Sequence, residues 1–310
     1  MFGIRKTAAA LAAAVCLTAM ASVPAVEAQT LKVAMNSDVK ILDPIWTTAY
    51  IQRDFGYMVW DTLFAVDSKF EVKPQMVDKY SVSPDKLTWT FTLRDGLKWS
   101  NGQPVTSEDC IASIKRWAAK DSMGQKMMES VAGFQAVDAK TFKMNMKEPY
   151  GLVLESLGKP SSNVPFMMPK KTAETDPNTQ IKIEDVIGSG PFMFSAKEWK
   201  PGEKVVFLKN PNYTPRSDPP SGLAGAKIAK VDRVEWIWIP DVQTHRMLQD
   251  RAPAARVNFK KRAAHAGDAT RNLYEIFGWR REFLDGGKNT AVFQIQLGLA
   301  HGVQAGVRKD

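Results

Sequence analysis

Residues 87–109 read LTWTFTLRDGLKWSNGQPVTSED, and this stretch predicts a strand, two turns and a helix start in direct succession. Over 87–93 large apolar residues alternate with threonine, which is the period-two pattern of a strand with one buried face. Asp-Gly at 95–96 and Asn-Gly at 101–102 favour tight turns. Thr-Ser-Glu-Asp at 106–109 places a side-chain oxygen at a cap position and a carboxylate three residues later, which predicts a helix from that point.

The rest of 29–244 alternates between the same two periods. Large apolar residues recur at three- and four-residue steps over 48–63, which predicts a helix with one buried face. A proline at 149 suits the start of a short helix that reaches 157. Further strands are expected at 31–35, in a hairpin over 133–146, and at 192–195, 205–208 and 233–239. Strand groups separated by helices predict a mixed α/β (α+β) fold.

The first 28 residues have the order of a secretory signal peptide. Arg5 and Lys6 precede an uncharged, alanine-rich stretch over 7–24, and Val-Glu-Ala follows at 26–28, so we expect cleavage after Ala28 and export of the chain. A membrane anchor is the alternative, but the apolar run is interrupted and shorter than the roughly 20 residues that a span requires. Cleavage leaves Cys110 as the only thiol, so no internal disulfide is expected.

The positive charge is concentrated near the end of the sequence. The net charge is +9, but 245–310 alone holds 12 basic against 6 acidic residues, and all three histidines follow residue 244. The charges of 29–244 are interspersed, as on an ordinary solvated surface, so nucleic acid is not an expected partner. The change in composition predicts that 245–310 is an atypical basic tail, frameshifted or poorly ordered. A genuine basic tail is the alternative.

Residues 1–244 contain no histidine, which removes the usual general base and the commonest zinc ligand. Gly-Ser-Gly at 188–190 lacks the flanking glycines of a nucleophile elbow, so we interpret it as a bend leading into a strand. The sequence has no glycine-rich phosphate loop. We therefore expect no enzyme activity, no catalytic residues, no metal site and no cofactor. Nine tryptophans favour a protein that binds a ligand through aromatic surfaces.

The stretch at 87–109, continued by Ser-Ile-Lys-Arg-Trp at 113–117, resembles the signature of the family 5 extracellular solute-binding proteins. These proteins serve ABC importers for oligopeptides, dipeptides, glutathione and nickel. Other matching motifs follow in the same order along the chain: Leu-Asp-Pro at 42–44, Asp-Thr-Leu-Phe at 61–64, Gly-Ser-Gly-Pro-Phe at 188–192 and Asn-Pro-Asn-Tyr at 210–213. The resemblance extends from about residue 30 to residue 244.

The resemblance implies a periplasmic binding protein-like first lobe, with 29–45 and 181–244 forming the lobe and 46–180 an extra subdomain. Family members are longer, and a second lobe follows the strand that ends near residue 239. We therefore expect a chain truncated after its first lobe and impaired in function. By the same resemblance, we expect a monomeric periplasmic substrate-binding component of an ABC importer for peptides or similar small solutes. It would deliver its ligand to permease subunits in the inner membrane.

The resemblance also places ligand-binding residues in two segments. Thr48 and Tyr50 follow the Leu-Asp-Pro motif and are expected to line the ligand cleft. Ser122, Met123 and Gly124, in the loop after the capped helix, are expected to face it too. For Tyr50 a capping or core position on its helix is an equal alternative, and for Met123 and Gly124 an ordinary loop position is the alternative.

Two other classes of protein stay open at this point. One is a secreted hydrolase that uses carboxylates alone, as glycosidases do, but the sequence has no convincing carboxylate pair for that chemistry. The other is a chaperone-like or structural periplasmic protein that uses its aromatic surface without a defined ligand. Saturable binding without a product separates the receptor from both.

Overall fold

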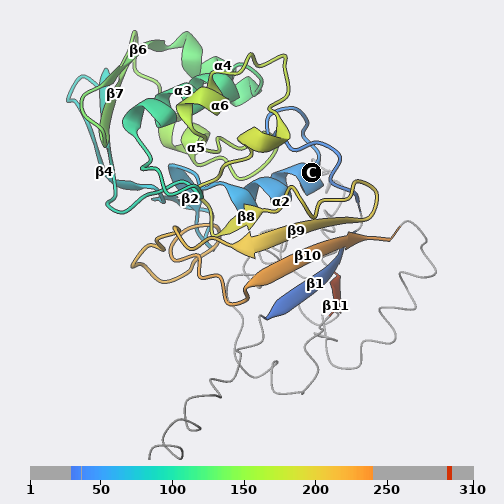
Figure 1. Cartoon of the computed structure of the whole chain (residues 1–310). Helices are drawn as coiled ribbons and strands as arrows, with labels where there is room; N and C mark the ends of the chain where they lie inside the picture. Colours follow the sequence, from blue (N-terminus) through green and yellow to red (C-terminus); the bar gives the residue numbers. More distant parts are fainter. Residues whose placement is uncertain (1–28, 36, 240–291, 295–310) are drawn as a thin grey trace, which may run out of the picture.

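The computed structural model describes residues 29–35, 37–239 and 292–294 of the 310-residue chain. Figure 1 shows a lower sheet, an upper group of helices beside a second sheet, and helix α2 between them. The lower sheet has the strand order β11-β1-β10-β9-β8 and the upper sheet the order β4-β5-β7-β6, while β2 pairs with β3. The signal peptide predicted for 1–28 and most of the tail predicted for 245–310 lie outside the described residues.

The elements confirm the mixed α/β class. The strands are β1 (Thr30–Met35), β2 (Phe64–Val66), β3 (Val72–Pro74), β4 (Val77–Val82), β5 (Thr88–Leu93), β6 (Val131–Ala136), β7 (Thr141–Met146), β8 (Phe192–Phe194), β9 (Lys204–Lys209), β10 (Arg233–Trp238) and β11 (Val292–Gln294). The helices are α2 (Tyr50–Val59), α3 (Ser107–Ala118), α4 (Ser122–Glu129), α5 (Val153–Leu157) and α6 (Lys170–Ala173), with a 3-10 turn at Ile183–Asp185. Within these described segments no helix combines the length and the apolar character needed to cross a membrane.

The lower sheet brings together strands that are far apart in the sequence. β1 runs parallel to β10, with Thr30 opposite Arg233 and Met35 opposite Trp238. β9 pairs antiparallel with both β10 and β8. The three described residues of β11 form a parallel pair with the other side of β1. The strands predicted before residue 36 and between 192 and 239 are therefore confirmed.

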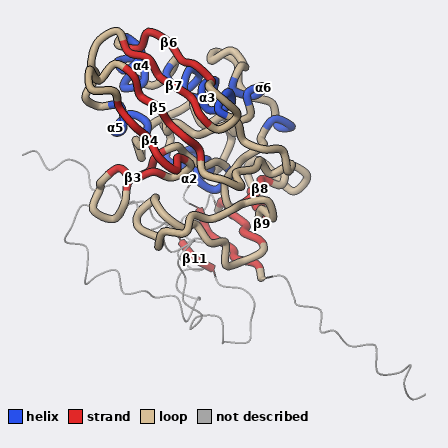
Figure 2. The backbone as a smooth tube through the Cα atoms, turned by 90° about the vertical axis from the view of Figure 1, so that its left-hand side faces the viewer, coloured by secondary structure: helices blue, strands red, loops and turns tan. Residues whose placement is uncertain are grey.

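The upper sheet contains β5, which corresponds to the alternating stretch at 87–93. Phe91 of β5 lies opposite Phe142 of β7, and their rings stack with centroids 5.1 Å apart. α3 begins where the sequence predicts it, because the Thr106 hydroxyl accepts the N–H of Asp109 while the Asp109 carboxylate accepts the N–H of Thr106 at 2.7 Å. Figure 2 shows α3 and α4 lying against one side of this sheet.

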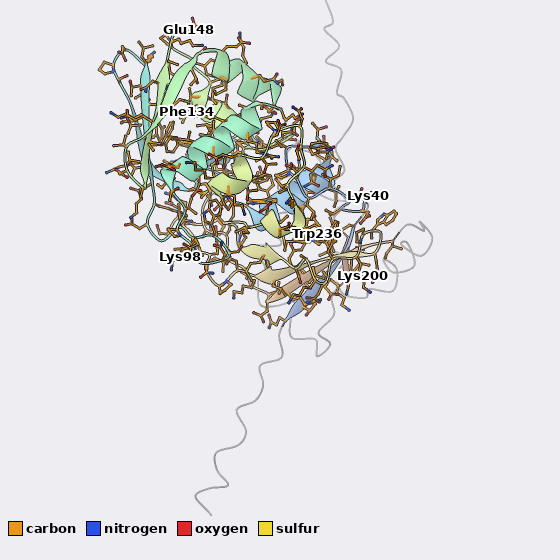
Figure 3. The ribbon with its side chains drawn as sticks, turned by 45° about the horizontal axis from the view of Figure 1, so that its top comes forward. Lys40, Lys98, Phe134, Glu148, Lys200 and Trp236 are labelled. Carbon is orange, nitrogen blue, oxygen red and sulfur yellow. The ribbon has the colours of Figure 1, made fainter. Side chains whose placement is uncertain are left out.

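The side chains form two hydrophobic cores. Figure 3 labels Trp236 on the lower sheet and Phe134 on the upper one. One core includes Phe55 of α2, Phe207 of β9 and Trp236 of β10. The other lies between the upper sheet and α3, and Phe134 packs at its margin. Helix α2 belongs to the range 46–180 of the sequence-based division, yet its apolar face packs in the core of the lower sheet.

Helix α2 is shorter than the predicted 48–63. Trp60 is extended, with φ −116° and ψ 155°, and the Val59 carbonyl accepts the N–H of Gly190 at 2.8 Å. A Cβ on Gly188 would lie 1.8 Å from that same carbonyl oxygen, and neither glycine has a positive φ. The glycines at 188 and 190 therefore serve close packing against the end of α2. The spacing of apolar residues over 48–63 cannot predict this contact, because the contact involves a segment more than 100 residues away.

A buried ion pair connects the segment after β1 to α3. Arg116 donates to both carboxylate oxygens of Asp43, at 3.0 and 2.7 Å, and the two side chains are 2% and 0% exposed. The Asp43 carboxylate also accepts the N–H groups of Ile45 and Ile181, and its backbone carbonyl accepts the N–H of Trp46. Paired geometry with further donors is what makes a buried ion pair tolerable.

We expect Arg116→Met to lower the free energy of unfolding by about 3 to 5 kcal/mol, because it leaves the Asp43 carboxylate buried without its counter-ion. The matched control is Lys126→Met, which breaks an exposed ion pair with Glu129 and should cost less than about 1 kcal/mol. Urea unfolding followed by circular dichroism measures both. Equal small losses in the two variants would contradict a structural role for the buried pair.

We expect Gly188→Ala to destabilise the chain by about 1 to 3 kcal/mol or more, because its methyl group would collide with the Val59 carbonyl. Gly151→Ala is the control, since no atom beyond its two chain neighbours lies within 4 Å of a Cβ at that position. Thermal unfolding of the two variants gives the comparison. An unchanged midpoint for Gly188→Ala would show that the close approach is relieved without cost.

Candidate functional site

The candidate site begins in the segment that leaves β1. In open sheets with parallel strands, ligands bind beyond the carboxyl ends of the strands. The chain leaving β1 passes through 37–49 into α2, and this passage carries two exposed aromatic side chains, Trp46 at 37% and Tyr50 at 41% exposure. Thr48 is exposed between them. Exposed large aromatic residues close together are typical of a contact surface.

A second segment, at the junction of α3 and α4, lies beside the first. The Lys120 ammonium is 5.8 Å from the centroid of the Trp46 ring. Asp121 caps α4 by accepting the N–H groups of Met123 and Gly124, both at 3.0 Å. The exposed side chains of the two segments form what we name the aromatic surface: Trp46, Thr48, Tyr50, Lys120 and Ser122.

A third segment, 159–163, is bonded to residues of both other segments and of α2. Lys159 forms an ion pair with Asp121. Arg53 of α2 donates to the Ser161 hydroxyl at 3.4 Å, and the Asn163 side chain donates to the Ile45 carbonyl at 3.0 Å. Trp117 of α3 donates to the Asn163 carbonyl at 2.7 Å. The three segments are therefore connected by hydrogen bonds and ion pairs rather than by proximity alone.

The predicted ligand-binding residues differ in their exposure. Thr48, Tyr50 and Ser122 are exposed on the aromatic surface, and Met123 is half-buried. Gly124 is buried, and a Cβ there would lie 2.7 Å from the Cα of Ala118, so this glycine allows α4 to pack against α3. Whether any of these residues touches a ligand stays a prediction.

The expected loop at 122–124 is wrong, because these residues form the first turn of α4. The Asp121 cap was the available signal for that helix. Sequence reasoning also missed Trp46, Lys120 and Arg53. An exposed aromatic residue just after the Leu-Asp-Pro motif could have indicated Trp46, but the pairing of Trp46 with Lys120 joins segments over 70 residues apart and has no local signature.

Arg53 and Asp54 form a second buried ion pair under this surface. Arg53 donates from Nε and Nη2 to one Asp54 oxygen at 3.0 and 2.9 Å, and its guanidinium lies 4.8 Å from the centroid of the Tyr50 ring. Burial raises the pKa of Asp54 from 3.8 to about 6, although the neighbouring Arg53 charge and its hydrogen bonds oppose the shift. Burial also raises the pKa of the neighbouring Tyr57 phenol.

A third buried polar cluster surrounds Asp61, between the upper sheet and 213–227. Lys227 donates to one Asp61 oxygen at 2.8 Å, and the side chains of Gln75 and Tyr213 donate to the other at 3.3 Å. Burial alone would raise the pKa of Asp61, but the Lys227 charge and hydrogen bond outweigh it and hold that pKa below its ordinary value. All members have partners, so this cluster holds segments together.

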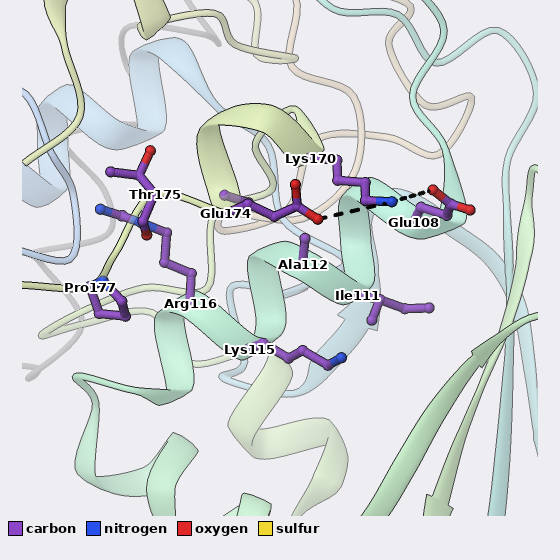
Figure 4. Close-up of a pocket in the computed structure, with 10 residues that line it drawn as sticks. Glu108, Ile111, Ala112, Lys115, Arg116, Lys170, Glu174, Thr175 and Pro177 are labelled. Carbon is purple, nitrogen blue, oxygen red and sulfur yellow. Dashed lines mark hydrogen bonds and ion pairs between the residues drawn. The ribbon is translucent and has the colours of Figure 1, made fainter. Parts of the chain in front are cut away.

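The groove between α3 and α6 is a separate feature (Figure 4). It has a volume of about 430 Å³ and an apolar floor that includes Ile111 and Ala112. Lys170 on its rim pairs with Glu108 at 2.8 Å and with Glu174 at 3.9 Å. Because its acidic side chains are paired within the rim and Arg116 is engaged by Asp43, the groove offers few free polar groups to a ligand.

Chemistry-bearing groups are sparse in the described part of the chain. Cys110 is fully buried in the core between the upper sheet and α3, and burial raises the pKa of its thiol. Among residues 29–35 and 37–239 no group of three or more histidine, cysteine, aspartate or glutamate side chains could hold a metal ion. The aromatic surface can therefore contribute ring contacts, hydroxyl groups and one ammonium group to a bound molecule.

Residues 71–252 match the sequence profile of the bacterial extracellular solute-binding proteins, family 5 Middle, which is more than half of the chain. The chain belongs to this family. A probable peptide ABC transporter periplasmic-binding protein, y4tO, of Sinorhizobium fredii is 42% identical over 208 residues, which cover 67% of this chain and 38% of that protein. The glutathione-binding protein GsiB of Salmonella paratyphi A is 26% identical, with 76% and 43% of the two chains covered.

Solved structures confirm the periplasmic binding protein-like fold. NikA from Brucella suis, in complex with Fe(III)-EDTA, superposes with a TM-score of 0.58 at 21% identity and covers 71% of this chain and 41% of that chain. OppA from Haemophilus influenzae, in complex with the peptide RPPGFSPFR, has a TM-score of 0.55 at 22% identity, with 72% and 45% covered. The chain thus spans less than half the length of these relatives.

We expect the raised pKa of Asp54 to appear as a pH dependence of stability. Between about pH 4 and pH 6 the folded chain binds more protons at Asp54 than the unfolded chain, so this residue lowers the free energy of unfolding as the pH rises through that window. The stability difference between wild type and Asp54→Asn should therefore shift in favour of the variant from pH 4 to pH 6. Urea unfolding at four pH values measures it.

Asp85→Asn provides the control for this pH series. A hydrogen bond from Ser83 is the main cause that holds the pKa of the exposed Asp85 below its ordinary value. The stability that Asp85 contributes is therefore lost only as the pH decreases below about 4. The difference between wild type and Asp85→Asn should be flat from pH 4 to pH 6. A flat difference for Asp54→Asn as well would contradict a raised pKa at Asp54.

Proposed function

We propose that the chain is the substrate-binding component of an ABC importer for peptides or similar small solutes. The observation that carries the proposal is the aromatic surface, which gathers exposed aromatic rings, hydroxyl groups and a cation after β1 in a chain of this family. One relative is named a probable peptide ABC transporter periplasmic-binding protein and another a glutathione-binding protein, which supports the same class of ligand. Export by the signal peptide and location in the periplasm belong to this proposal.

Binding without a covalent step fits the chemistry of the surface. Aromatic rings supply contact area, and hydroxyl groups with an ammonium group supply hydrogen bonds. A receptor of this kind signals occupancy because its ligand binds one conformation more tightly than another. We propose that the occupied protein, acting as a monomer, then delivers its ligand to permease subunits in the inner membrane.

The aromatic surface by itself is open, and this limits the affinity that we expect. Small-molecule sites normally enclose most of their ligand, and a surface that covers one side leaves the other side hydrated. We therefore expect the chain to bind peptides with a Kd of roughly 0.1 to 1 mM, which corresponds to about 4 to 5.5 kcal/mol of binding free energy.

We expect Tyr50→Ala to weaken peptide binding about fivefold or more, because an exposed ring on a contact surface contributes about 1 kcal/mol or more. The full chain is titrated with a mixture of tripeptides while tryptophan fluorescence is recorded. Phe70→Ala, at a turn between β2 and β3, removes a ring that is 56% exposed elsewhere and should change nothing.

Three outcomes of this titration would count against the proposal. Turnover of the peptides would indicate a hydrolase. Non-saturable quenching that rises equally with unfolded polypeptides would indicate a chaperone-like role. An equal loss of binding in the Tyr50→Ala and Phe70→Ala variants would place the ligand away from the aromatic surface.

A further inference from the structure

Lys120 differs from the other cations around the aromatic surface. Three neighbouring cations are each paired with a carboxylate: Arg53 with Asp54, Lys159 with Asp121, and Arg116 with Asp43. Lys120 is exposed, and no carboxylate of the described residues lies within ion-pair distance of it. The aromatic surface therefore has one positive charge that the described part of the chain does not neutralise.

The position of the Lys120 ammonium is nevertheless defined. It donates to the Asn178 side-chain oxygen at 2.7 Å and lies 5.8 Å from the centroid of the Trp46 ring. A lysine ammonium has three donors, so the contact with Asn178 leaves two for other partners. The face of an indole ring also attracts a cation and reduces its freedom to move. The group is held in place and still has hydrogen-bonding capacity.

We propose that Lys120 and Trp46 form a subsite that takes a carboxylate of the bound solute, with the part of the solute beside that carboxylate resting on the indole ring. The inference rests on the proposed function and specifies its ligand class. A solute with a free carboxylate next to an apolar or aromatic group fits the pair. The same solute with a neutral amide in place of the carboxylate cannot neutralise the ammonium.

The magnitude follows from the exposure of the pair. A charge-assisted hydrogen bond is stronger than a neutral one, but solvent screens an exposed ion pair. We expect the free carboxylate to bind about three- to tenfold more tightly than the amide at low salt. The preference for the free carboxylate should shrink as the salt concentration is raised from 20 mM to 500 mM, because added salt screens the attraction between exposed charges.

The test compares two probes on the full chain. One is a mixture of tripeptides with free carboxyl termini, and the other is the same mixture with carboxyl-terminal amides. Both are titrated against wild type, Lys120→Gln and Lys120→Arg, with circular dichroism confirming that each variant is folded. Lys126→Gln is the control, because it removes an exposed lysine of α4 that already pairs with Glu129.

The expected result is a preference for the free carboxylate in wild type, Lys120→Arg and Lys126→Gln, and equal affinity for the two mixtures in Lys120→Gln. Equal affinities in wild type, or a preference that persists in Lys120→Gln, would overturn the carboxylate subsite and leave the proposed function standing. Failure of wild type to bind either mixture would overturn the proposed function and the subsite together.

Discussion

The buried ion pair between Asp43 and Arg116 is the contact on which the arrangement of the site depends. Asp43 stands in the segment that leaves β1, and its backbone carbonyl holds the N–H of Trp46. Arg116 stands one helical turn before Lys120, at the end of α3. The same interaction therefore positions both the indole and the ammonium of the aromatic surface. Its removal would weaken the connection between the two segments, because it leaves the Asp43 carboxylate buried without its counter-ion.

Sequence reasoning succeeded where the signal was local. The alternation over 87–93 corresponds to β5, and the cap at 106–109 corresponds to the start of α3. Both signals depend only on residues that are neighbours in the sequence. It failed at the end of α2, where the close approach of 188–190 to Val59 ends the helix earlier than the apolar spacing predicts. Thr48, Tyr50 and Ser122 were predicted as ligand-binding residues through motif order, and the structure places all three at exposed positions. Trp46 and Lys120 were missed because their relation exists only after the fold has formed.

In the described part of the chain, the buried ion pairs and the exposed Lys120 of the aromatic surface differ in their surroundings. Asp61 with Lys227, and Asp43 with Arg116, are nearly without solvent contact, and each carboxylate also accepts hydrogen bonds from neutral donors. Such clusters specify which segments meet, and they have little capacity left for a ligand. The aromatic surface has the opposite character, with exposed rings and hydroxyl groups. Rigid, satisfied polar contacts beneath an exposed apolar surface limit the conformational entropy that binding must remove.

Arg53 and Lys120 illustrate why one cation of the surface is suited to recognition and another is not. Both lie near an exposed ring, but the Arg53 donors are directed to Asp54 and Ser161, so a ligand carboxylate would have to displace a carboxylate of the protein itself. Lys120 requires no such exchange, since its recorded hydrogen-bond partner is the neutral side chain of Asn178. Any element that covers the aromatic surface would also remove water around Lys120 and Trp46, and lower local dielectric strengthens an ion pair. The Lys120 charge, which contributes little binding free energy on an open surface, therefore contributes more when the ligand is enclosed.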